Sequence, residues 1–150
     1  MTLKNTLNFF ESIKTSTTNK SEIKVYERFI HILNGLKTRK FSEEEFQSIE
    51  AELHRLNLES NPANRKKYFK KSLSAFEKYL KHSFSLTAAR YYTNLYGGLG
   101  MSFGILFGTI FLSNLERSLG LTFGLIGGMV VGSLIGRNKD DQAKAAGNIL

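Results

Sequence analysis

The residue types that most often perform chemistry are few in this chain, and their spacing does not form a site. The three histidines, His31, His54 and His82, are expected on three different helices, and none stands in an HExxH-like pair. The absence of cysteine excludes disulfides, thiol catalysis and Cys-based metal sites. The carboxylates of residues 43–45 suit the first turn of a helix, where they stabilise the positive end of the helix dipole. The sequence therefore predicts no enzyme, no metal and no cofactor.

Glycine recurs at every fourth position near the C-terminal end of the chain. One row is Gly120, Gly124, Gly128, Gly132 and Gly136, and a shorter row in the preceding apolar stretch is Gly100, Gly104 and Gly108. Residues four apart lie on one stripe of a helix, and a stripe without side chains lets a second helix approach closely. The rows predict helix packing at a crossing angle of about −40°, within one chain, between copies, or both. Because the second row is longer than the first, the pattern favours a homo-oligomer.

The glycine rows lie in two stretches that carry no charge. Tyr91 to Leu115 covers 25 positions and Ser118 to Gly136 covers 19, with a polar turn of Asn114, Glu116 and Arg117 around the join. As helices, both stretches are long enough to cross about 30 Å of hydrocarbon. The sequence predicts a transmembrane hairpin with spans of about 93–114 and 118–136. The alternative is a buried helical hairpin in a soluble protein.

The net charge of +8 is concentrated just before the apolar region. Residues 1–59 carry nine basic and nine acidic side chains, whereas residues 60–90 carry eight basic side chains against one acid, Glu77. Basic residues flank both outer ends of the spans, so the positive-inside rule predicts both termini in the cytoplasm and a location in the inner membrane. Tyr91, Tyr92 and Tyr96 fit an aromatic belt at the cytoplasmic interface.

The basic segment also has a helical pattern. Apolar residues recur at three and four positions: Phe69, Leu73, Phe76, Leu80 and Phe84. The lysines are expected on the opposite face: Lys66, Lys67, Lys70, Lys71, Lys78 and Lys81. A juxtamembrane basic face attracts anionic lipid headgroups. A solvated helix face is the alternative, and no nucleic-acid partner is expected because no recognisable nucleic-acid-binding fold is present.

Residues 1–59 read as three short amphipathic helices. Ser21 is a candidate N-cap for the second helix, while Ser42 and Glu45 form a capping box for the third, with Phe41 and Phe46 at staple positions. The pair at 61–62, Asn-Pro, suits the start of a fourth helix. With no further breaker before position 91, the pattern favours a fourth helix that continues into the first span.

The stretch from Gly97 to Gly136 resembles the glycine-zipper membrane proteins, and the whole layout resembles small uncharacterised bacterial membrane proteins with a helical cytoplasmic head. The resemblance implies packing roles for the eight glycines of the two rows and assigns no active site. We expect an all-α fold with a neutral head over 1–59, a basic juxtamembrane helix over 60–90, a hairpin over 91–137 and a polar cytoplasmic tail over 138–150.

The expected function is that of a non-enzymatic integral membrane protein that self-associates through its glycine faces, with the head as an interaction or regulatory module for an unknown protein partner. An alternative is a small oligomeric pore lined by Ser102, Thr109, Thr122 and Ser133. A third is a soluble or peripheral protein whose hairpin packs into a partner.

Overall fold

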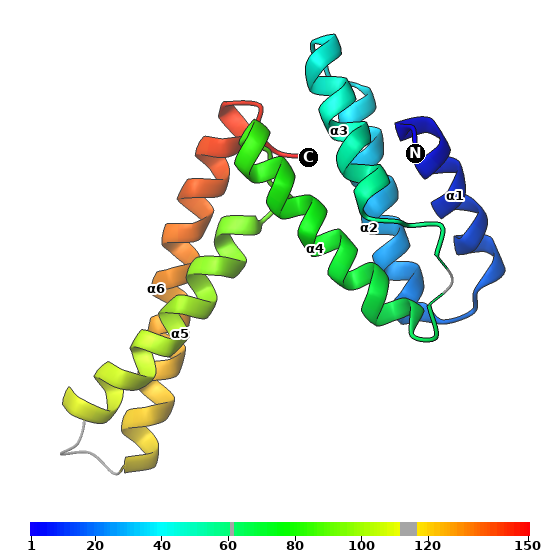
Figure 1. The fold of residues 1–150 in the computed structure, drawn as a ribbon. Helices are drawn as coiled ribbons and strands as arrows, with labels where there is room; N and C mark the ends of the chain where they lie inside the picture. The colour runs from blue at the N-terminus through cyan, green and yellow to red at the C-terminus, as the bar shows by residue number, and fades with distance from the viewer. Residues whose placement is uncertain (61, 112–116) are drawn as a thin grey trace. The chain divides into compact units, whose positions relative to one another are not determined.

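The computed structural model describes residues 1–60, 62–111 and 117–150, and these residues form an all-α protein, as predicted (Figure 1). Its six helices are α1 (Leu3–Ser16), α2 (Lys20–Lys37), α3 (Glu43–Arg55), α4 (Arg65–Phe84), α5 (Tyr91–Phe111) and α6 (Arg117–Ala145). The chain divides into two compact units. We call residues 1–86 together with Leu150 the head, and residues 87–149 the hairpin.

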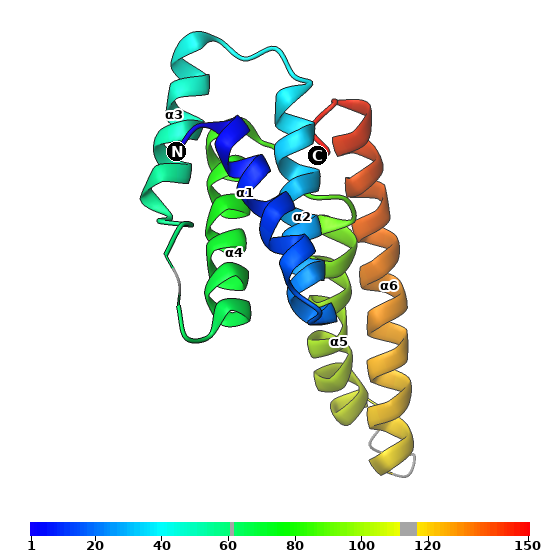
Figure 2. The same cartoon turned by 90° about the vertical axis from the view of Figure 1, so that its right-hand side faces the viewer.

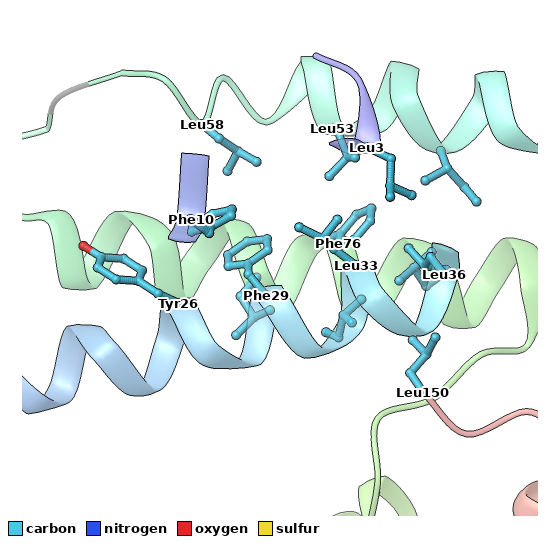
Figure 3. Packing of buried hydrophobic residues seen from close by; sticks show 14 of the residues in the cluster. Leu3, Phe10, Tyr26, Phe29, Leu33, Leu36, Leu53, Leu58, Phe76 and Leu150 are labelled. Carbon is cyan, nitrogen blue, oxygen red and sulfur yellow. The ribbon is translucent and has the colours of Figure 1, made fainter. Parts of the chain in front are cut away.

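The head is built around one aromatic-rich core. Phe10 of α1 stacks on Phe29 of α2 with ring centroids 4.2 Å apart, and Phe69 of α4 meets Phe10 edge-to-face at 5.6 Å. Figure 3 shows Phe10, Phe29 and Phe76 together in this core. Each such side chain is fully buried and is worth about 1.5–3 kcal/mol in water-to-core transfer. The three- and four-residue periodicity of the apolar positions therefore places α1 to α4 around one centre.

Leu150 belongs to this same core although it follows the hairpin in sequence. It is 8% exposed, and a methyl group built on Gly35 of α2 would lie 3.5 Å from Leu150 Cδ2. Figure 3 shows Leu150 beside Leu36. The core of the head is thus completed by a residue from the far end of the sequence.

The helix starts follow local capping chemistry. The Ser42–Glu45 capping box at the start of α3 is confirmed. The N-cap of α2 is Asn19, whose Oδ1 accepts from the Ser21 N–H at 3.0 Å, so the prediction of Ser21 as cap is wrong by two residues. The predicted start of α4 at Pro62 is also wrong, because the Asn64 side chain caps the helix by accepting from the Lys67 N–H at 3.0 Å. Residue 61 lies outside the described residues.

The prediction that the fourth helix continues into the first span is wrong. Helix α4 ends at Phe84, and Ser85 takes a left-handed conformation with φ 56°. The Leu86 N–H then donates to the Leu80 carbonyl at 3.2 Å, and the Leu86 side chain is buried. A left-handed residue directly after the helix, with its N–H bonded back into the last turn, is a common helix stop. The stop separates α4 from α5.

The hairpin consists of the antiparallel helices α5 and α6, which lie side by side in both Figure 1 and Figure 2. Its two ends meet at a parallel bridge between Thr87 and Ile149, where the Thr87 N–H donates to the Asn148 carbonyl at 2.8 Å. Helix α6 continues to Ala145, so the first part of the predicted polar tail is helical. The predicted turn residues Asn114 and Glu116 lie outside the described residues.

Candidate functional site: the glycine seam of the hairpin

The glycines of α5 face the glycines of α6. A Cβ built on Gly124 would lie 2.8 Å from the Gly108 Cα, and one built on Gly128 would lie 2.8 Å from the Gly104 Cα. Carbon atoms normally approach to about 3.5–4.0 Å, so a methyl group at either position would force the helices apart. We call this contact line the glycine seam, which contains the eight glycines predicted as packing positions: Gly100, Gly104, Gly108, Gly120, Gly124, Gly128, Gly132 and Gly136.

One copy of α5 covers the longer row along its length. Gly132 meets the backbone of Tyr96 as well as Gly100, and a Cβ on Gly136 would lie 2.7 Å from the Thr93 nitrogen. The greater length of the second row therefore gives no reason to expect a second copy, contrary to the prediction, because ordinary backbone of α5 covers the additional glycines. Homo-oligomerisation stays a prediction without this support.

Asp140 continues the glycine row by four residues and caps the start of α5. Its carboxylate accepts from the Tyr92 N–H at 2.9 Å, from the Thr93 N–H at 2.9 Å and from the Thr93 hydroxyl at 2.7 Å. Burial opposes its ionisation, but these hydrogen bonds and the Arg90 charge outweigh burial and lower the pKa of Asp140, which lies beyond the uncharged stretch of α6. Sequence reasoning missed this residue, although its place in the four-residue register was a usable signal.

The outer surface of the hairpin is apolar. All fifteen large hydrophobic side chains that are exposed in the described residues lie on α5 and α6, with Ile110 reaching 66% exposure and Phe123 60%. Among the described helices, Ser118–Ala145 of α6 is long and apolar enough to cross a membrane, and α5 does not meet that test over its described residues. The seam glycines thus face the helix contact, and the large apolar residues face outward.

Helix α4 presents the predicted basic face. Lys66, Lys67, Lys70, Lys71 and Lys78 are exposed, Lys81 is half-buried, and the first five have no ion pair within the described part of the chain. The one acid on this helix, Glu77, instead pairs with Arg28 of α2, with Nε and Oε1 2.6 Å apart. Burial raises the pKa of Glu77 despite the opposing effect of Arg28. The five exposed lysines are therefore available to an external anion.

The remaining candidates for chemistry are dispersed. His31, His54 and His82 are exposed on α2, α3 and α4, and the described residues contain no group of three or more His, Cys, Asp or Glu placed to hold a metal.

Three of the four residues predicted to line a pore bond within their own helix. The hydroxyls of Ser102, Thr109 and Thr122 donate to backbone carbonyls three or four residues earlier. Ser133 lies at the helix contact, where its Oγ would be 3.1 Å from a Cβ on Gly97.

No known protein family, curated protein or solved structure matches the chain. The seam, the apolar surface and the basic face are therefore the features of the chain that bear on its function.

Proposed function

We propose that this chain is a non-enzymatic integral membrane protein. The hairpin spans the bilayer through α5 and α6, and the head serves on the cytoplasmic side as an interaction or regulatory module. The observation that carries the proposal is the distribution of side chains in the hairpin, with glycine at the helix contact and fifteen large apolar side chains exposed. Moving such a surface from water into hydrocarbon is worth roughly 10–20 kcal/mol.

The lengths and charges of the hairpin support this placement. The 19 uncharged residues from Ser118 to Gly136 rise about 28 Å as a helix, which matches a hydrocarbon core of about 30 Å. Arg137 and Lys139 follow directly, and Arg90 precedes α5. Because cationic residues favour the cytoplasmic side, both ends of the hairpin are assigned to that side.

The basic face of α4 fits the same orientation. Its five exposed lysines carry no internal ion pair in the described chain. A lysine close to an anionic leaflet gains about 1 kcal/mol. In this proposal the basic face contacts anionic headgroups, and the glycine seam joins the two helices of one chain. Self-association of copies is then a property separate from the packing within the hairpin.

Alkaline carbonate extraction of membranes tests the proposal. The full chain, tagged at the N-terminus, is expressed in bacteria and the membranes are washed at high pH. Retention in the pellet until detergent is added supports an integral hairpin, and release to the supernatant refutes it. Protease treatment of inverted and right-side-out vesicles then tests the orientation, because only inverted vesicles expose a cytoplasmic head.

A further inference from the structure

One side of the glycine seam opens into an apolar groove with a volume of about 610 Å³. Its floor is formed by seam glycines together with Gly127, and its walls are formed by large side chains of both helices: Leu99, Phe103, Phe107, Phe123, Val131 and Ile135. A row of glycines removes the side chains that would otherwise fill this space. The close approach of the helices therefore creates a slot along their contact line.

The dimensions of the groove limit what fits in it. It runs from Tyr96 to Gly108 on α5 and from Phe123 to Ile135 on α6, which corresponds to about 18 Å along each helix. A volume of about 610 Å³ over that length gives a mean cross-section of at least roughly 34 Å². The groove is wide enough for a hydrocarbon chain.

Cationic side chains outnumber carboxylates beyond one end of the groove, where α6 carries Arg137, Lys139 and Lys144 against Asp140 and Asp141. Lys139 lies one turn beyond Ile135 on the same face of α6, is exposed, and has no ion pair within the described residues. Tyr96 lines the same end of the groove. A second copy lying parallel in the membrane would bring its own Arg137 and Lys139 to this end, and like charges repel. An anionic ligand is complementary to it.

We propose that the groove binds one acyl chain of an anionic phospholipid from the cytoplasmic leaflet, with the lipid phosphate held near Lys139. The groove length of about 18 Å is slightly more than half of a hydrocarbon core of about 30 Å, which suits a chain from one leaflet. This inference rests on the proposed membrane placement of the hairpin.

Two glycines provide a matched pair of variants. A Cβ on Gly127 and a Cβ on Gly98 would each meet nothing within 4 Å, so a side chain can leave the backbone at either position without a clash at the seam. Gly127 lines the groove, whereas Gly98 does not. Gly127→Leu therefore fills the groove with side chain, and Gly98→Leu makes the same chemical change elsewhere on the hairpin.

The experiment is native mass spectrometry of the delipidated full-length protein in mild detergent, titrated with phosphatidylglycerol or phosphatidylcholine. The wild type and Gly98→Leu are expected to bind one phosphatidylglycerol per chain, and Gly127→Leu is expected to bind it at least about tenfold more weakly. Lys139→Gln is expected to lose the preference for phosphatidylglycerol over phosphatidylcholine. This second variant leaves the groove intact and so does not depend on the folding of Gly127→Leu.

Two results would overturn the inference. One is equal lipid binding by Gly127→Leu and Gly98→Leu. The other is a wild-type dimer that Gly127→Leu alone converts to a monomer, because a second copy would then be the occupant. Carbonate extraction of the same variants distinguishes failure of this inference from failure of the proposed function. If all variants stay in the membrane pellet and Gly127→Leu binds lipid as the wild type does, only the groove is refuted. If all variants are released, the membrane placement is refuted.

Discussion

Replacing Gly128 with alanine should push the two helices of the hairpin apart. The added methyl would lie 2.8 Å from the Gly104 Cα and closer still to the Gly100 carbonyl oxygen. Overpacking of this kind costs about 1–3 kcal/mol when the backbone must shift. At the neighbouring Gly127 the same methyl meets nothing within 4 Å, so Gly127→Ala is the matched control.

An introduced disulfide can measure this cost because the chain has no cysteine of its own. A Cβ on Gly97 would lie 3.1 Å from the Ser133 Oγ, which suits the pair Gly97→Cys and Ser133→Cys for a disulfide. The equilibrium between the dithiol and the disulfide is set with a glutathione buffer in liposomes. The reduced hairpin relieves a clash by separating, whereas the disulfide holds the helices at their native distance.

The disulfide equilibrium constant should therefore fall at least about fivefold in Gly128→Ala, since 1 kcal/mol corresponds to that factor. The gain of about 1 kcal/mol from replacing glycine in a helix is present in both redox forms and cancels. Gly127→Ala should leave the constant unchanged within about twofold. Equal effects of the two substitutions, or no effect of either, would refute the seam as described. Moving the first cysteine to Gly98, whose Cβ has no neighbour within 4 Å, should prevent the bond.

Three further predictions concern the cap, the core and the basic face. Asp140→Ala should cost about 0.5–2 kcal/mol and speed hydrogen exchange of the Thr93 amide measured by NMR, with Asp140→Asn retaining part of the protection. Because the pKa of Asp140 is lowered from 3.8, its stabilisation is present above that pH and is lost as the pH falls through the folded value. The difference in exchange between the wild type and Asp140→Ala should therefore disappear at the acid end, and a difference that persists unchanged below the folded pKa would contradict this role. Phe10→Ala should lower the free energy of unfolding of the head by about 3–5 kcal/mol, measured by urea titration followed by circular dichroism. Phe9→Ala should lower it by less, because the Phe9 side chain is only half-buried. Equal losses in the two variants would contradict the core as described. Acetylation of the exposed lysines should be slower in anionic than in zwitterionic liposomes, and high salt should remove this difference. Equal acetylation rates in the two kinds of liposome would count against lipid contact by Lys66, Lys67, Lys70 and Lys71.

The sequence was informative where structure depends on local chemistry. The capping box of Ser42 and Glu45 involves groups three residues apart, so its effect is independent of the rest of the fold. The periodicity of Phe69, Phe76 and Leu80 placed these residues in the core and the lysines outside, because burial of one helix face follows from the 3.6-residue repeat.

Features that depend on competing or distant partners were not predictable in the same way. Residues 61 and 64 are both asparagines, and only the fold of the connecting segment decides that Asn64 is the cap. Ser85 stops α4 in a left-handed conformation that sequence rules assign to glycine. The glycine rows revealed that close packing exists, but a stripe does not name its partner, and Asp140 acquires its role only when Thr93 is brought beside it.

Leu150 gives the chain an unusual order of assembly. Because this residue lies in the core of the head and the hairpin occupies residues 87–149, the hairpin is in effect an insertion within the head. A ribosome adds about 5–20 residues per second, so the first 86 residues wait about 3–13 seconds for the side chain that closes the core beside Gly35. During that interval the hairpin is synthesised. Closure of the head can thus occur only after the hairpin has been made, which ties maturation of one unit to the synthesis of the other.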